Sequence, residues 1–241
     1  MDSIMLISGA IGLAPALALL FFALRDYTFP AVEKPYFDDR KVFIFLTFGM
    51  IAGSIFFLME AAFGTANILY VLLVVIVEEM LKFIIFNSRK YSGHIDTTFY
   101  AFSFGIGAAS IITVGNTYLA LTSAVAKASL TVAGILLLVI YAFMIAFMWG
   151  STSAIIGLGA AKKEPVHYTV LAIMIHLFYS IVLVPFYLNL EPWSYLSFAV
   201  VAVFMLYVFW QTYSYIIPST IPPEARPEKW RSIKSKEKTG K

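Results

Sequence analysis

Seven long apolar segments constrain the fold of this chain more than any other feature of its sequence. They cover roughly residues 3–24, 42–60, 66–87, 97–121, 129–160, 166–189 and 194–217. A helix needs about 20 mostly apolar residues to cross the hydrocarbon core of a bilayer. We therefore predict an all-α, polytopic membrane helix bundle with seven transmembrane helices. The fifth segment is too long for a straight crossing, so we expect that helix to tilt or to break near Gly150 or Gly157.

The composition excludes several classes of protein. Hydrophobic residues make up 61% and charged residues 13% of the 241 residues, whereas soluble domains contain about 45–50% and about 25%. A soluble globular enzyme, a disordered protein and a nucleic-acid-binding protein are therefore excluded. The chain contains no cysteine, so it has no disulfide, thiolate metal ligand or cysteine nucleophile. We expect its partners to be membrane lipids and a transmembrane or lipid-anchored protein, which is either a substrate or a binding partner.

The lysines and arginines predict the orientation. Fifteen of the 17 lie in segments that would face one side of the membrane, Lys127 lies on the other side, and Lys82 lies inside a helix. Positive residues are enriched in cytoplasmic loops, so we place the N-terminus outside and the C-terminus in the cytoplasm. We expect one transmembrane domain, 1–217, and a basic cytoplasmic tail, 218–241, in a multi-pass protein of the cell membrane.

The third apolar segment contains the residues that are most costly to place in a membrane. Glu78, Glu79 and Lys82 each cost about 2.5–3.5 kcal/mol at the bilayer centre, so they should face the protein interior or a water-filled cavity. Glu78 and Lys82 are four residues apart with the glutamate first, so we expect them to form the ion pair. Two adjacent carboxyls in different protonation states would suit acid–base catalysis on a water molecule. The alternative is a structural ion pair that joins two helices.

The fifth and sixth segments place further polar groups at the same depth. His176 lies about 15 Å from the cytoplasmic end of its helix at 1.5 Å per residue, which is close to the depth of Glu78. Ser151, Thr152 and Ser153 in the fifth segment reach a similar depth. Polar groups from three helices at one level are typical of an intramembrane site. The alternatives are a buried histidine bonded to a backbone carbonyl, and hydroxyls that bond within or between helices.

Other polar residues carry weaker predictions. We expect Asp96 to cap the fourth helix and Glu60, at a helix end, to lie at the membrane interface. Asn116 should lie near the outer end of the fourth helix, above the proposed layer. A serine nucleophile would require Ser180 or Ser151 beside His176 and a third group to orient it, and the spacing does not favour this. Zinc sites usually have two or three strong nitrogen or sulfur ligands, so we expect no metal and no cofactor.

Several motifs follow one another in a familiar order. They are APALALLFFALRDYTFP in the first segment, EEMLK at 78–82, DTTFYAFSFGIGAASIITVGNTY from Asp96, GSTSAIIGLG at 150–159 and HLFYS at 176–180. Together they resemble the PrsW family of glutamate-dependent intramembrane proteases, in the wider group of CAAX-type proteases, and EEMLK matches the EExxK signature of that family. The helix order is also similar to that of the anterior-pharynx-defective subunit of gamma-secretase.

The resemblance implies an intramembrane endopeptidase that hydrolyses a peptide bond of a membrane-anchored substrate. Glu78 would be the general base that activates water, Glu79 would tune it, and His176 would donate toward the oxyanion. The supporting residues would be Lys82, Asn116, Ser151 and Ser180.

Three positions differ from the family pattern. Gly115 stands where a second glutamate is expected, Trp149 where a histidine is expected, and Ser180 where the last motif usually ends in Asn or Asp. These differences support an alternative hypothesis, a catalytically degraded pseudo-protease that acts as a membrane scaffold or substrate-binding subunit. A third hypothesis is a proton-coupled transporter that uses the Glu-Lys-His layer, although the sequence lacks the inverted repeats of many transporters.

Overall fold

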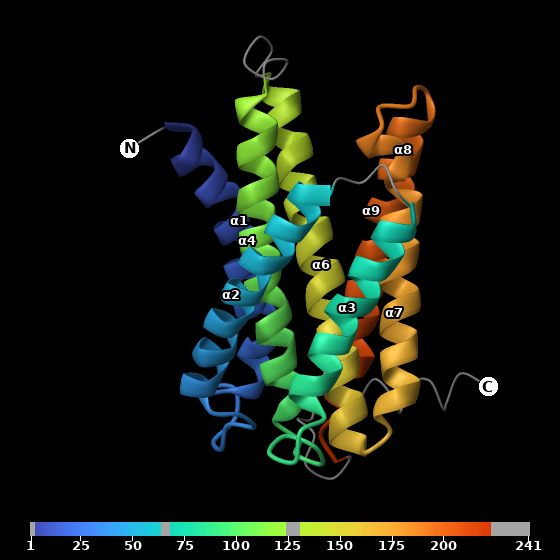
Figure 1. Ribbon diagram of the computed structural model, residues 1–241. Helices are drawn as coiled ribbons and strands as arrows, with labels where there is room; N and C mark the ends of the chain where they lie inside the picture. Colours follow the sequence, from blue (N-terminus) through green and yellow to red (C-terminus); the bar gives the residue numbers. More distant parts are fainter. Residues whose placement is uncertain (1–2, 64–67, 124–130, 223–241) are drawn as a thin grey trace, which may run out of the picture.

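The computed structural model describes residues 3–63, 68–123 and 131–222, and none of these residues lies in a β-strand (Figure 1). The helices are α1 (Ser3–Leu24), α2 (Asp39–Phe63), α3 (Ile68–Phe86), α4 (Thr97–Thr122), α6 (Val132–Lys162), α7 (Pro165–Val182), α8 (Val184–Tyr187), α9 (Trp193–Gln211) and α10 (Ile217–Ser219). A 3-10 turn, Arg25–Tyr27, follows α1, and a π-helical turn, Thr212–Ile216, connects α9 to α10. The predicted all-α class is confirmed.

Six helices among the described residues are long and apolar enough to cross a membrane. They span Ser3–Tyr27, Asp39–Ala62, Thr97–Thr122, Val132–Lys162, Pro165–Tyr187 and Trp193–Ser219. These helices are those of a multi-pass membrane protein. The predicted seventh crossing, α3, is not among them; it contains Glu78, Glu79 and Lys82 within 19 residues.

Helix α6 is continuous through its 31 residues, so the break predicted near Gly150 or Gly157 is wrong. A Cβ atom added at Gly157 would lie 2.6 Å from the Cβ of Ala101, because α4 packs closely there. The glycine therefore serves helix packing and does not interrupt the helix. At 1.5 Å per residue the helix is about 46 Å long, which exceeds the roughly 30 Å thickness of a hydrocarbon core. Of the two possibilities we expected, a tilt of the whole helix is the one that remains.

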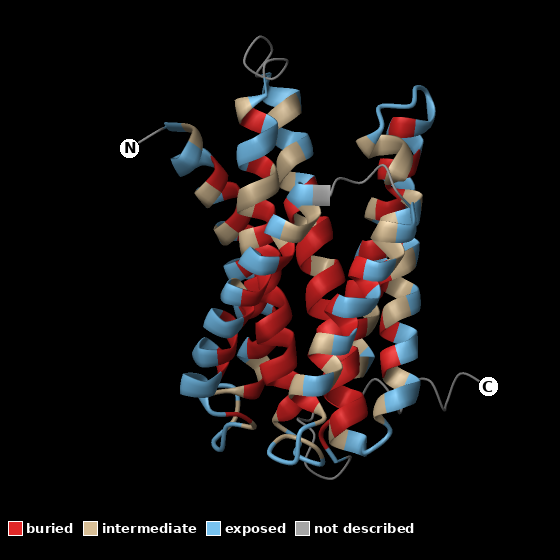
Figure 2. Ribbon diagram, in the orientation of Figure 1, coloured by how far each residue is buried: buried red, intermediate tan, exposed pale blue. Residues whose placement is uncertain are grey.

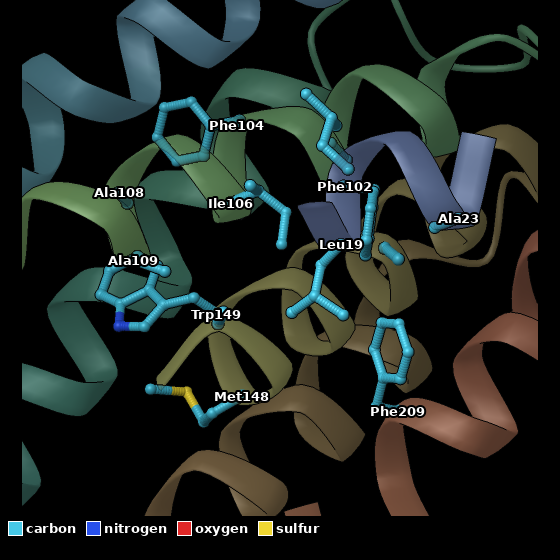
Figure 3. Packing of buried hydrophobic residues seen from close by; sticks show 14 of the residues in the cluster. Leu19, Ala23, Phe102, Phe104, Ile106, Ala108, Ala109, Met148, Trp149 and Phe209 are labelled. Atoms are coloured by element: carbon cyan, nitrogen blue, oxygen red, sulfur yellow. The ribbon is translucent and has the colours of Figure 1, made fainter. Parts of the chain in front are cut away.

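Helix α4 is the central element of the bundle. In an apolar stretch of 18 residues within α4, 83% of the residues are buried, against 28–39% in the corresponding stretches of the other five candidate membrane spans. Figure 2 shows this contrast between the interior and the periphery. Helix α2 packs closely on one side of α4, because Gly49 and Gly53 leave room for the α4 backbone. On the other side, α1, α4, α6 and α9 contribute interlocking side chains (Figure 3), including Leu19, Phe102, Ile106, Trp149 and Phe209.

The two ends of the bundle differ in charge. The connections 25–38, 87–96 and 163–164 lie together at one end, the lower end in Figure 1, and contain most of the described lysines and arginines. The start of α1 lies at the other end and α10 lies at the basic end. Large apolar side chains cover the outside, with Phe21 71% and Leu69 72% exposed, as expected of a surface that contacts lipid. Which side of a membrane the basic end faces stays a prediction.

Asp96 occupies the position before α4, but its side chain makes no capping hydrogen bond, so the predicted capping bond is wrong. Its backbone is already helical (φ −69°, ψ −15°), whereas a capping residue usually has extended geometry that turns its side chain back to the first amides. The Asp96 carboxylate interacts with the Tyr100 hydroxyl instead.

Candidate active site

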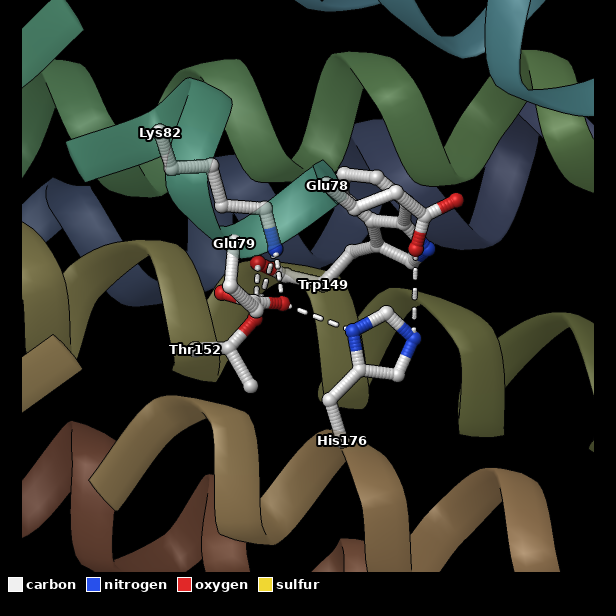
Figure 4. Close-up of polar contacts among 6 residues, drawn as sticks. All are labelled: Glu78, Glu79, Lys82, Trp149, Thr152 and His176. Carbon is white, nitrogen blue, oxygen red and sulfur yellow. Dashed lines mark hydrogen bonds and ion pairs between the residues drawn. The ribbon is translucent and has the colours of Figure 1, made fainter. Parts of the chain in front are cut away.

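A buried polar cluster joins α3, α6 and α7 in the middle of the bundle (Figure 4). Lys82 Nζ donates to Glu79 Oε1 at 2.6 Å and to Thr152 Oγ1 at 2.9 Å. The Nδ1 atom of His176 lies 2.7 Å from the same Glu79 oxygen. All four side chains are buried. One carboxylate oxygen on α3 therefore binds a cation on its own helix and an imidazole on α7.

The predicted ion pair between Glu78 and Lys82 is wrong, because Lys82 pairs with Glu79. On a helix, side chains three positions apart and side chains four positions apart are both close enough to pair. Helix geometry alone therefore does not decide whether Lys82 pairs with Glu78 or with Glu79. The tertiary structure makes the choice through Thr152 and through Trp149, whose ring centroid lies 4.0 Å from Lys82 Nζ. Helix α6 thereby holds the Lys82 ammonium beside Glu79, and Glu78 faces the cavity and His176 instead.

His176 is oriented by this arrangement. Glu79 is paired with an ammonium and is therefore ionised, and an ionised carboxylate can only accept hydrogen bonds. Nδ1 of His176 must then carry the hydrogen and donate it to Glu79 Oε1. The opposite ring nitrogen, Nε2, then points to Glu78, 3.5 Å from its Oε2 atom (Figure 4). His176 thus bridges two carboxyl groups and does not bond to a backbone carbonyl. A carboxylate that orients a histidine toward a second reactive group is a recurring arrangement in catalytic sites.

Glu78 and His176 lie on the wall of a cavity of about 70 Å³. A water molecule needs roughly 10–15 Å³ of such space and a few polar partners, so the cavity has room for several. The polar lining residues are Glu60, Tyr70, Glu78, Asn116, Tyr141, His176, Tyr179, Ser180 and Tyr187. The cavity extends from Glu78 toward the end of the bundle where α2 ends and α8 lies. The cavity is therefore mostly apolar, with a few carboxyl, imidazole, amide and hydroxyl groups on its wall.

Glu60, which we expected at the membrane interface, lines this cavity. Its carboxyl lies near enough to that of Glu78 for the two groups to interact. The last turns of α2 are held beside the cavity because the Tyr70 hydroxyl donates to the backbone carbonyl of Met59 at 2.8 Å. The sequence contained a signal for Glu60: it is a carboxylate within an apolar helix, with no basic residue in the neighbouring turns. Its position near the end of that helix favoured the interface instead.

Sequence reasoning also missed the tyrosines of the cavity. The hydroxyls of Tyr141 and Tyr187 lie 3.0 Å apart, and Asn116 Nδ2 donates to Tyr141 at 3.2 Å. Tyr179 lines the same cavity. Nothing in the sequence distinguishes them from tyrosines on the outside such as Tyr195, which is 63% exposed, because only the packing of the helices decides which face is interior.

The remaining predicted residues fall in different places. Ser180 and Asn116 line the cavity, whereas Ser151 is buried but is not among the lining residues. Trp149 forms part of the wall beside Glu78, with its ring centroid 5.8 Å from that of His176.

Comparisons of the chain with protein-family models, with curated proteins and with solved structures find no match. Within the part of the chain that the structure describes, no group of three or more His, Asp, Glu or Cys side chains is placed to hold a metal ion. The chemistry of the site is therefore argued from its own residues: two carboxyls and an oriented imidazole around a chamber that can hold water, a set suited to proton transfer.

Proposed function

We propose that the protein is an intramembrane endopeptidase, similar to PrsW-type and other CAAX-type proteases, that hydrolyses a peptide bond of a membrane-anchored substrate. The observation that carries the proposal is the 3.5 Å separation of Glu78 Oε2 and His176 Nε2 at the wall of a cavity that has room for water. A general base must lie within hydrogen-bond reach of the proton it removes, directly or through one water. A water molecule in this cavity meets that condition.

In the proposed reaction Glu78 removes a proton from the water as its oxygen attacks the peptide carbonyl carbon. His176, held through Nδ1 by Glu79, presents Nε2 beside the same point and, when protonated, donates to the oxygen that becomes negative. Lys82 keeps Glu79 in place and so acts as a positioning residue. Burial strengthens these interactions because the surrounding helices exclude bulk water.

We also propose that α3 is a seventh crossing helix, with the N-terminus outside and the C-terminus in the cytoplasm of a cell-membrane protein. Its ionisable side chains are all buried against neighbouring helices, while Leu69, Leu73 and Ile84 are 55–72% exposed on its outer face. A helix of this kind is stable in lipid when its polar groups bond to its neighbours. In Figure 1, α3 runs from about the level at which α2 ends, below the tops of α4 and α6, to the basic end of the bundle.

The experiment that tests this function uses Glu78→Gln, which keeps the size of the side chain and removes its basicity. The protein and the variant are reconstituted with a mixture of membrane proteins in water enriched in oxygen-18, and new C-termini are identified by mass spectrometry. We expect labelled termini with the protein and a loss of about 10²–10⁴-fold with the variant, the usual contribution of a general base. The same termini with both proteins, or none with either, would overturn the proposal.

A scaffold that retains the fold without catalysis is the second candidate. Trp149 favours it, because its ring lies over Lys82 where the resembled family has a histidine. This candidate predicts that Glu78→Gln leaves the binding of membrane-protein partners unchanged and that no labelled termini form.

A further inference from the structure

The cavity contains a carboxyl that the reaction above does not use. Glu60 reaches the cavity from α2 and Glu78 reaches it from α3, so two carboxyls from different helices meet in one small cavity. We propose that Glu60 is a second catalytic carboxyl of this site, the acid that protonates the leaving nitrogen. This inference rests on the proposed peptidase function and adds a residue to it.

The closeness of the two carboxyls favours a shared proton. Two ionised carboxylates offer only acceptors and repel one another, so two carboxyls on the wall of one small cavity are more stable when they hold one hydrogen between them. The other ionisable groups around the pair are His176 on α7, Tyr70 on α3, and Glu79 and Lys82, which are paired with each other. The hydroxyls of Tyr141, Tyr179 and Tyr187 also face Glu60 from α6, α7 and α8. Two carboxyls that hold one proton supply an acid and a base at the same point.

Packing at one glycine brings Glu60 to the site. The ring of Phe57, one turn before Glu60, lies against Gly115, where an added Cβ would be 2.5 Å from the ring. Because the Phe57 ring occupies the space next to Gly115, a side chain at position 115 could not reach the cavity without displacing that ring. Gly115 is where the resembled family has a second glutamate, and here the second carboxyl is supplied by a different helix.

The proton balance of the reaction is then closed. Movement of the shared proton to Glu60 leaves Glu78 ionised, and Glu78 takes one proton from the water as the C–O bond forms. When the C–N bond breaks, Glu60 gives its proton to the nitrogen, which leaves as an amine, and the other fragment leaves as a carboxylic acid. The proton on Glu78 returns to Glu60, so the pair regains its starting state.

The first test does not depend on catalysis. Infrared spectra of the reconstituted protein in H₂O and D₂O report the carbonyl stretch of a buried protonated carboxyl. We expect such a band in the protein, and we expect it to be lost or shifted in Glu60→Gln and in Glu78→Gln. Glu191→Gln, which alters an exposed carboxyl, should leave it unchanged. An unchanged band in Glu60→Gln would overturn the inference.

The second test uses the oxygen-18 assay. We expect Glu60→Gln to lower the yield of labelled termini by about 10²-fold or more, and Glu60→Asp, which keeps a carboxyl, to retain more activity than Glu60→Gln. If cleavage depends on Glu78 but Glu60→Gln cleaves at the normal rate, the inference fails and the proposed function stands. If no termini form while the band depends on both glutamates, the proposed function fails and the proton-sharing pair stands without a catalytic role. If Glu60→Gln does not fold, Glu60→Asp and Glu78→Gln carry the infrared test.

Discussion

The carboxylate of Glu79 lies 2.7 Å from Nδ1 of His176, although the two residues are 97 positions apart in the chain. This contact connects α3 to α7 at a depth where water is scarce. Helix α3 carries Glu78, Glu79 and Lys82, which are costly to place in a membrane. This cost is reduced because Glu79 pairs with Lys82 and also binds His176. The same contact directs the free nitrogen of the imidazole at Glu78.

Glu79→Gln should therefore destabilise the protein strongly. The change leaves the buried ammonium of Lys82 without its anionic partner, and breaking a buried ion pair in this way costs about 3–5 kcal/mol. Unfolding of the purified protein in detergent, followed by circular dichroism with increasing temperature or denaturant, measures the loss.

A double-mutant cycle separates this pair from general damage. Lys82→Met should also destabilise, whereas adding Lys82→Met to Glu79→Gln should cost less than the sum of the two single changes, because no unpaired charge remains. Lys90→Met, at an exposed position, is the matched control. Unfolding of Glu79→Gln at the same midpoint as the parent would contradict the buried pair.

Gly115→Ala should move the end of α2 away from the cavity. The new methyl group would overlap the Phe57 ring, and inserting a group into a packed interior typically costs about 1–3 kcal/mol. We expect a lower unfolding midpoint together with a weaker infrared signal from the carboxyl pair. Reducing the ring in Gly115→Ala with Phe57→Leu should recover part of both.

Gly9→Ala is the control for this change, because a Cβ at Gly9 would meet nothing within 4 Å. It removes the same backbone flexibility from a helix without steric overlap, and alanine is favoured over glycine in a helix by about 1 kcal/mol. Equal stability of the two alanine variants would show that Gly115 is not a packing constraint.

Cysteine labelling tests the topology, since the chain has no cysteine of its own. Ala62→Cys and Ser88→Cys introduce exposed thiols on either side of α3. With a maleimide that cannot cross membranes, we expect Ala62→Cys to react in intact cells and Ser88→Cys to react only after permeabilisation, because the basic end should be cytoplasmic. Labelling of both from one side would show that α3 does not cross, and the reverse pattern would show the opposite orientation.

The helices themselves could be predicted because their causes are local. Apolar segments long enough for a bilayer, punctuated by charged connections, predicted the bounds of α1 and α4 to within one residue, since a backbone in lipid must satisfy its own hydrogen bonds. The predicted segments 166–189 and 194–217 run past the ends of α7 and α9 and match the longer spans Pro165–Tyr187 and Trp193–Ser219. The continuity of α6 was not predictable from its glycines. A glycine that breaks a helix and one that admits a neighbouring helix look alike in sequence, and only the position of α4 distinguishes them.

The sequence alone determined that this is a helical chain for lipid surroundings, and that Glu78, Glu79, Lys82 and His176 are too costly at depth to face lipid. Only the tertiary structure decided which of them pair, because residues three and four apart are equally close on a helix and the choice falls to α6 and α7. It also brought Glu60 into the cavity. The physical reason is that hydrophobicity sets where a residue lies along the membrane normal, whereas the packing of helices sets which way its side chain points.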